Sequence, residues 1–238
     1  MAQYDSLAAF YDAVNGEPVD TVRHILSYIE EFLPSAHSVL ELGCGTGAVL
    51  ASLGSGFTLT GIDHSAAMLE FAHRRCPEAT YIEGDITSFE FGQCFDVVLC
   101  VENTLNHLTD FAQWRSVFAH VARHLTAGGL FIFDLNTLGR LRELAELEPW
   151  VHDFDDHTLI MDVDFENEPL AKWNIRIFEA LGEGTFRRHD ETIVELGVAL
   201  SDVRDALAEQ FTVAAESDAE EGSPSDDSGY ALFVARQR

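Results

Sequence analysis

Apolar and polar positions follow two different spacings along the first 137 residues. Within 17–33, apolar residues recur every three or four positions, which is the spacing of one helix face. Short apolar runs, typical of buried strands, separate such segments. The predicted helices are 4–14, 17–33, 65–75 and 110–125, with a short one after Gly47, and the predicted strands are 38–42, 58–62, 80–83, 95–101 and 130–133. This alternation predicts a parallel sheet with helices on both faces.

Capping and helix-stopping residues mark several of these boundaries. Ser65 and Asp110 can each accept a hydrogen bond from the first turn of a following helix. Pro34 cannot continue the helix before it. Gly128 and Gly129 are expected to end the helix that starts after Asp110.

The pattern changes after the fifth strand. Residues 139–147 look helical, and from Trp150 to Leu196 polar and apolar residues alternate, which predicts an antiparallel meander. A helix over 201–210 and strands over 211–216 and 230–236 then restore the first pattern. In open α/β sheets ligands bind beyond the carboxyl ends of the strands. An insertion after strand five emerges at that edge and could cover such a site.

Charge and cysteine usage narrow the class of protein. The chain of 238 residues carries a formal net charge of −27, which disfavours binding to nucleic acid and to anionic membranes. Its four cysteines form no C-x-x-C pair and no metal-binding spacing, so we expect free thiols, no metal and a reducing cytoplasm. No apolar segment reaches the roughly 18 residues of a membrane span. We therefore predict a cytoplasmic enzyme with a small-molecule substrate.

Three glycines follow the first strand directly, in the stretch VLELGCGTG. Gly43, Gly45 and Gly47 have the spacing G-x-G-x-G, one residue tighter than the dinucleotide-binding fingerprint. Glu41 stands just before them, and a carboxylate there suits a cationic ligand better than a pyrophosphate. Close approach of a ligand to the backbone would explain why side chains are missing here.

Two further acids end the next strands. Asp63 lies 20 residues after Gly43, where an acid accepts hydrogen bonds from ribose hydroxyls. Asp85 follows the third strand and can accept from an adenine amino group, with Ile86 beside the ring. Each acid alone could be an ordinary turn or cap residue. Their repetition at successive strand ends favours a nucleoside-containing ligand.

At this point the sequence resembles the class I S-adenosylmethionine-dependent methyltransferases. The similarity covers about residues 1–137 and the end of the chain from about 200. It rests on ELGCGTG at 41–47, GID at 61–63, EGDI at 83–86, FDVVLCV at 95–101 and LTAGGLFIFDLNT at 125–137. The opening YDSLAAFYD and NTLNHL at 103–108 resemble the small-molecule branch of that family.

The resemblance implies an α/β fold with a Rossmann-like, seven-stranded methyltransferase sheet, mostly parallel with the last strand antiparallel. The cofactor domain would comprise 1–137 and 197–238, and 138–196 would form an inserted antiparallel β cap over the substrate site. It also implies S-adenosylmethionine as cofactor and S-adenosylhomocysteine as product. The residues expected to bind the cofactor are Glu41 (ammonium), Gly43, Gly45, Gly47 (backbone approach), Asp63 (ribose), His64, Met68, Asp85, Ile86 (adenine), Val101 and Glu102 (sulfonium).

Candidates for catalysis and acceptor binding follow from proximity to those motifs. Tyr4 and Tyr11 are seven residues apart and share one helix face, so they could cover the methyl group, although plain packing is an alternative. We take Tyr11 and His107 as catalytic candidates. The acceptor candidates are Tyr4, Asn103, Asn136 and Arg187, and Asn106 lies in the same region.

Arg187 belongs to the only basic cluster of the acidic second half, Arg187-Arg188-His189. It could hold a substrate carboxylate or phosphate, or pair with Asp190, Glu191 or the acids at 153–156. The sequence leaves the acceptor, the methylated atom (nitrogen, oxygen or carbon) and the need for a base open. A homodimer paired through edges of the meander is also possible.

Other functions share part of this pattern. A nicotinamide-dependent oxidoreductase would also need a strand, a glycine loop and a ribose-binding acid, but the tight loop and Asp85 argue against it. A non-catalytic protein that binds the same cofactor remains an alternative. A methyltransferase of nucleic-acid bases is disfavoured by the charge and by ENTL at 102–105, where an N-P-P-Y type motif would be expected.

Overall fold

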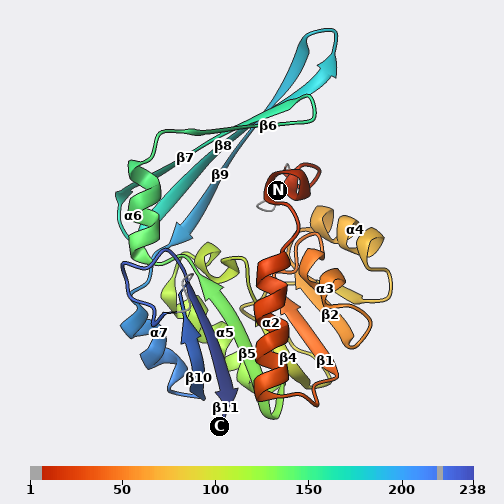
Figure 1. Ribbon diagram of the computed structural model, residues 1–238, viewed down its shortest axis with the longest axis vertical. Helices are drawn as coiled ribbons and strands as arrows, with labels where there is room; N and C mark the ends of the chain where they lie inside the picture. The colour runs from red at the N-terminus through yellow and green to blue at the C-terminus, as the bar shows by residue number, and fades with distance from the viewer. Residues whose placement is uncertain (1–6, 219–221) are drawn as a thin grey trace.

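Two β-sheets and their helices make up the described part of the chain, residues 7–218 and 222–238, in a computed structural model. The larger sheet runs in the order β10-β11-β5-β4-β1-β2-β3 (Figure 1). Its strands are β1 (Ser38–Leu42), β2 (Thr58–Asp63), β3 (Thr80–Glu83), β4 (Phe95–Cys100), β5 (Leu125–Leu135), β10 (Phe211–Ser217) and β11 (Ala231–Gln237). Pairs among β1 to β5 are parallel, whereas β11 is antiparallel to both β5 and β10. The predicted Rossmann-like methyltransferase sheet, with its antiparallel last strand, is confirmed.

Helices cover both faces of this sheet because side chains along each strand point alternately to either side. Leu40, Val98 and Phe131 pack on the face covered by α5 (Phe111–His124) and α7 (Leu200–Leu207). Val39 and Ile132 pack on the other face, under α2 (Val19–Phe32), α3 (Ala48–Leu53) and α4 (Ala66–Arg75). Burial on both faces explains why these strands are continuous apolar runs.

The second sheet is an antiparallel meander of four strands, as the alternating pattern predicts. It comprises β6 (Trp150–Phe154), β7 (His157–Asn167), β8 (Leu170–Gly182) and β9 (Thr185–Leu196). The helix α6 (Leu138–Glu146) connects β5 to it and buries Leu141 against Phe165 and Ala171. Figure 1 shows this sheet above the larger sheet, at the end where β5 is followed by α6.

The start of the chain differs from the prediction. Among the described residues of the helix expected over 4–14, a turn covers 7–10 and α1 (Tyr11–Asn15) follows it, ended by Gly16 at φ +73°. Leu7 and Phe10 are buried against Leu159 and Ile175 of the four-stranded sheet. Tertiary contacts with that sheet therefore determine the conformation of this segment. Tyr4 lies outside the described residues.

The caps at Ser65 and Asp110 are confirmed, because both side chains accept hydrogen bonds from the first turns of α4 and α5. The glycine stop is wrong: α5 already ends at His124, and Gly128 and Gly129 lie within β5. The register of β4 and β5 shifts there, and a Cβ on Gly129 would lie 2.9 Å from the Asp96 carbonyl oxygen. Gly129 permits close strand pairing and Gly128 adopts a φ of +77°, so neither glycine ends a helix.

Candidate functional site

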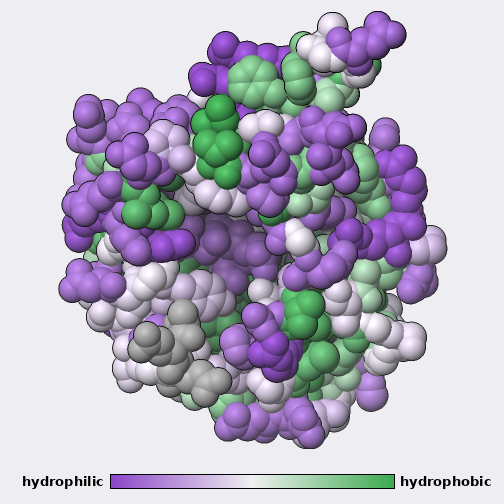
Figure 2. Space-filling model, turned by 45° about the horizontal axis from the view of Figure 1, so that its top comes forward, coloured by the Kyte–Doolittle hydropathy of each residue, from purple (hydrophilic) through white to green (hydrophobic). Residues whose placement is uncertain are grey.

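A cavity of about 370 Å³ opens at the carboxyl ends of β1, β2 and β4. Figure 2 shows a hollow near the centre of this side of the molecule with hydrophilic residues at its bottom. All but one of the predicted cofactor residues line the cavity: Glu41, Gly43, Gly45, Asp63, His64, Met68, Asp85, Ile86, Val101 and Glu102. Parallel strands bring their carboxyl ends together, so motifs more than 40 residues apart in the chain share this wall.

The three loop glycines have different structural reasons. All have positive φ, at +69° for Gly43, +50° for Gly45 and +73° for Gly47. A Cβ on Gly43 would lie 2.5 Å from Thr104 Cγ2, and one on Gly47 would lie 2.9 Å from the Tyr81 hydroxyl. Only the Cβ position of Gly45 faces open space. Gly47 was expected to line the cavity, but it lies behind the loop, where packing against Tyr81 and α4 requires glycine.

Glu41 places a carboxyl group in the cavity wall with little solvent around it. The residue is only 3% exposed, and its Oε2 has no hydrogen-bond partner among the described residues. Burial raises the pKa of Glu41 well above its usual value, and the charges of Glu102 and Asp63 raise it further. A buried carboxyl group of this kind is stabilised by a cationic ligand.

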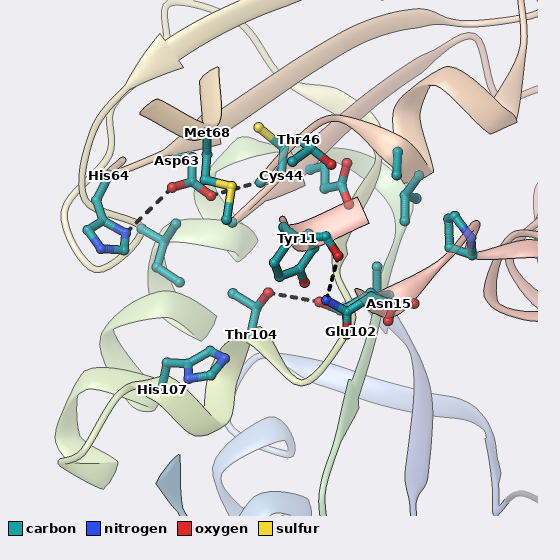
Figure 3. Close-up of a pocket in the computed structure, with 18 of the residues that line it drawn as sticks. Tyr11, Asn15, Cys44, Thr46, Asp63, His64, Met68, Glu102, Thr104 and His107 are labelled. Carbon is teal, nitrogen blue, oxygen red and sulfur yellow. Dashed lines mark hydrogen bonds and ion pairs between the residues drawn. The ribbon is translucent and has the colours of Figure 1, made fainter. Parts of the chain in front are cut away.

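Asp63 shapes the loop as well as lining the cavity. Its Oδ2 accepts a hydrogen bond from the backbone N–H of Gly45 at 2.9 Å, and its Oδ1 accepts one from Ser65 at 2.9 Å. His64 Nδ1 lies 3.6 Å from Asp63 Oδ1 (Figure 3). A carboxylate has about four acceptor positions, so Asp63 retains capacity for ligand hydroxyls.

A turn after β4 carries Glu102 and Asn103 in the left-handed region, at φ +58° and +59°. Two consecutive non-glycine residues there are strained and need support from their surroundings. Asp134 gives that support by accepting from the N–H of Glu102 at 3.0 Å and of Asn103 at 2.6 Å. Burial raises the pKa of Asp134 to about 7.

Asp134 escaped the sequence analysis as a site residue. The signal was present, because it is an acid within the apolar run LFIFDL at the carboxyl end of a buried strand. Asp134 is only 1% exposed, and a carboxyl group buried to this extent needs hydrogen-bond donors within the protein.

The helix α1 closes one side of the cavity. Asp12 Oδ1 accepts a hydrogen bond from Thr46 Oγ1 at 2.6 Å, and Asp12 Oδ2 lies 2.6 Å from Arg75 Nη2 of α4. These contacts hold Tyr11 over the cavity, where Figure 3 shows it among the lining side chains, with Asp63 and His64 to one side and Glu102 to the other. The sequence motifs gave no indication of Asp12 or Arg75.

A second cavity of about 200 Å³ lies under the four-stranded sheet. It shares Tyr11, Asn15, Glu102 and His107 with the first, so the two are neighbours. The predicted acceptor residues Asn103 and Asn136 line it, as does Glu195, which the sequence analysis did not single out. Burial lowers the pKa of His107 to about 4 and raises the pKa of Tyr11, so both are neutral near pH 7.

Arg187 lies apart from both cavities. It is 60% exposed on the hairpin of β8 and β9 and pairs with Glu179 at 3.1 Å. Its neighbours are also paired, Arg188 with Asp190 and His189 with Glu179. The structure therefore corrects the prediction that Arg187 contacts a substrate anion, because its charge is used across the hairpin.

Comparison with known proteins agrees with this geometry. Residues 39–129 match the family model of a methyltransferase domain. This part of the chain is therefore similar to methyltransferase domains. The matched segment contains the glycine loop, Asp63, Asp85 and the Glu102 turn, which form most of the first cavity.

Two curated relatives and one solved structure illustrate the similarity. The dTDP-4-amino-2,3,4,6-tetradeoxy-D-glucose N,N-dimethyltransferase of Saccharopolyspora spinosa is 33% identical over 53% of this chain and 53% of its own length. The dTDP-3-amino-3,6-dideoxy-alpha-D-glucopyranose N,N-dimethyltransferase of Streptomyces fradiae is 32% identical over 54% and 52%. The chain thus spans about half the length of these curated relatives.

The crystal structure of a S-adenosylmethionine-dependent methyltransferase from Clostridium acetobutylicum ATCC 824 has the same fold. It superposes with a TM-score of 0.87 at 22% identity, covering 98% of each chain. The similarity in fold therefore extends over the four-stranded sheet, beyond residues 39–129 that the family model matches. No helix among the described residues combines the length and apolar character needed to cross a membrane.

Proposed function

We propose that this protein transfers a methyl group from S-adenosylmethionine to a small-molecule acceptor. The observation that carries the proposal is the buried Glu41, which lines the first cavity beside the glycine loop and Asp63 and whose Oε2 has no hydrogen-bond partner among the described residues. The ligand that fits is cationic and carries a nucleoside. S-adenosylmethionine has both properties, and an enzyme of this family is the natural context.

The residues that would hold the cofactor follow from their chemistry. Glu41 would receive its ammonium group, Asp63 its ribose hydroxyls and Asp85 its adenine amino group. Met68 and Ile86 would contact the adenine ring. When bound, S-adenosylmethionine supplies a methyl group on a sulfonium, and S-adenosylhomocysteine is left as product.

The protein's own contribution would be to position the acceptor against the methyl group and to exclude water from the two cavities. Tyr11 and Glu102 line both cavities, as do Asn15 and His107, so an acceptor in the second cavity would approach the cofactor past these residues. Holding the acceptor in line with the methyl group accelerates the reaction without a strong catalytic acid or base. Residues 138–196 would act as the cap that positions the acceptor.

Calorimetric titration tests this proposal. Wild-type protein is titrated with S-adenosylhomocysteine and with 5′-methylthioadenosine, which lacks the amino acid part. In Glu41→Gln we expect affinity for S-adenosylhomocysteine to fall about tenfold to hundredfold, because a charge-assisted hydrogen bond contributes about 1.5–3 kcal/mol. Affinity for 5′-methylthioadenosine should stay within about twofold.

Glu30→Gln is the matched control, because Glu30 is an exposed carboxylate of α2 that lines neither cavity. It should bind both ligands as the wild type does. Absence of S-adenosylhomocysteine binding to the wild type would overturn the proposed function. Equal losses of both ligands in Glu41→Gln would contradict the role given to this carboxylate.

A further inference from the structure

The second cavity has predominantly apolar walls. The apolar residues of these walls come from the start of the chain and from all four strands of the smaller sheet. The apolar wall residues are Leu7, Phe10, Val14, Trp150, Leu159, Met161, Trp173, Ile175, Ile177 and Ile193. A cavity of about 200 Å³ with such walls fits a compact molecule with an apolar body.

One end of this cavity is polar and fixed in place. Glu195 of β9 is only 5% exposed, and its Oε2 accepts a hydrogen bond from Asn136 Nδ2 at 3.0 Å. Asn136 is itself held by Asn106, whose Oδ1 accepts from the Asn136 N–H at 3.0 Å and whose Nδ2 donates to the Asn136 carbonyl at 3.0 Å. The carboxyl group of Glu195 therefore has a defined position at the cavity wall.

The described lining of the cavity offers no lysine or arginine to an anion. Among the described residues, neither cavity is lined by a lysine or an arginine. Glu102 adds a second carboxyl group to the lining of this cavity and also lines the first, where Asp12, Glu41, Asp63 and Asp85 are present as well. A phosphate or diphosphate would lie in a low-dielectric space beside acids without a cation to compensate it.

We propose that this cavity binds the methyl acceptor as an amine on an apolar, unphosphorylated body, and that Glu195 receives a proton from its ammonium group. This inference rests on the proposed function. In the proton step the N–H bond breaks, its electron pair stays on nitrogen as the lone pair, and the proton forms a new O–H bond on the Glu195 carboxylate. The neutral amine is the nucleophile that methyl transfer needs.

The other titratable groups of this cavity are Tyr11, Glu102 and His107. Tyr11 stays protonated and His107 stays neutral near pH 7, since burial raises the pKa of the first and lowers that of the second to about 4. Burial raises the pKa of Glu195 to about 7, against the effect of the Asn136 hydrogen bond. Ionisation of Glu195 around neutrality therefore makes it available as a proton acceptor.

The proposed acceptor differs from the substrates in the names of the two curated relatives, which are dTDP-linked amino sugars. It shares with them an amine as the methylated group. The difference lies in the diphosphate, for which the described lining of both cavities has no cation.

Calorimetry of the full chain saturated with S-adenosylhomocysteine tests the inference. The probes are 2-phenylethylamine, cyclohexylamine and hexylamine, with 2-phenylethanol and thymidine diphosphate as comparisons. We expect at least one amine to bind, 2-phenylethanol to bind at least tenfold more weakly than the best amine, and thymidine diphosphate not to bind. Amine affinity should rise about tenfold between pH 6 and pH 8.

Three variants separate the role of Glu195 from a general loss of structure. Glu195→Gln should weaken amine binding about tenfold or more and remove its pH dependence, while S-adenosylhomocysteine affinity is unchanged. Met161→Trp should fill the cavity and weaken amine binding without affecting S-adenosylhomocysteine. Glu166→Gln, which changes an exposed carboxylate of β7 that lines neither cavity, should match the wild type.

The outcomes distinguish this inference from the proposed function. If S-adenosylhomocysteine does not bind, the proposed function fails. If it binds but no amine does, or if the alcohol binds as well as the amine, the acceptor class is wrong. Binding of thymidine diphosphate at comparable strength, or an unchanged pH dependence in Glu195→Gln, would also overturn the inference.

Discussion

At the scale of single residues, Asn106 shows how a polar side chain near a site can be structural. It was a candidate for contact with the ligands because it lies in NTLNHL. In the structure it is fully buried and lines neither cavity. Its Nδ2 donates to the carbonyls of Asn136 and Leu196, at 3.0 and 2.9 Å, and its Oδ1 accepts from Asn136. The residue thus ties the turn after β4 to the ends of β5 and β9.

We expect Asn106→Ala to lower the free energy of unfolding by about 3 kcal/mol, because it leaves two carbonyls and one N–H without their partner in a buried place. Urea unfolding followed by circular dichroism measures the loss. Asn174→Ala is the control: Asn174 donates to Asp162 at the exposed surface, so the change should stay within about 0.5 kcal/mol. Similar losses in both variants would argue against the structural role of Asn106.

At the scale of elements, the glycine loop joins β1 to α3 with three positive φ values in five residues. The sequence predicted the loop and its place between a strand and a helix. From the sequence, all three glycines were expected to have one cause, a ligand close to the backbone. Packing against Thr104 and Tyr81 accounts for two of them, and neither contact is visible from local sequence.

Gly43→Ala should destabilise the protein by about 3 kcal/mol, from the left-handed backbone and from the contact with Thr104. Adding Thr104→Ala removes that contact, so the double variant should recover at least about 1 kcal/mol relative to the sum of the single changes. Urea unfolding of the four proteins gives this coupling energy. Strict additivity would mean that the Thr104 side chain moves aside freely.

Gly45→Ala provides the matched comparison within the same loop. Its Cβ position meets no protein atom within 4 Å, so we expect a stability loss of only about 1 kcal/mol from the backbone conformation. Because the added methyl group points into open space beside the cavity, S-adenosylhomocysteine affinity should fall at least about tenfold in calorimetry. Unchanged affinity would contradict the place that the proposed function gives to this loop.

At the scale of the whole molecule, acidic residues lie in the interior as well as on the surface. The chain has a net charge of −27, and Glu41, Asp134 and Glu195 are buried carboxyl groups with raised pKa values. The pKa values of Asp134 and Glu195 lie at about 7, whereas carboxyl groups in an unfolded chain titrate near 4. The folded state therefore holds protons that the unfolded chain has released. Stability is highest while these groups are protonated and falls as the pH rises.

We expect the free energy of unfolding to be larger at pH 6 than at pH 8, with Asp134 and Glu195 together contributing about 2 kcal/mol and Glu41 adding to the difference. His107 acts in the opposite direction, since its pKa is lowered to about 4, but its effect lies mostly below pH 6.5. Urea unfolding at the two pH values measures the difference. Glu195→Gln should remove roughly half of the joint contribution of Asp134 and Glu195. Greater stability at pH 8 than at pH 6 in the wild type would contradict the assigned burial.

Local sequence patterns were enough to predict the order of elements, the class of fold and most of the first cavity. These depend on apolar periodicity and on motifs at strand ends, which a parallel sheet necessarily gathers at one edge. The role of Asp134 was not predicted from the sequence, because the role of a buried acid depends on which backbone groups lie opposite it.

Tertiary packing fixed how the inserted sheet and the start of the chain lie against that edge. It turned the expected first helix into a short segment, directed Arg187 to Glu179 and brought Glu195 next to Asn136, 59 residues away. Such pairings depend on packing between distant segments, for which local sequence carries no periodic signal. The first cavity was therefore predictable from sequence, whereas the second required the structure.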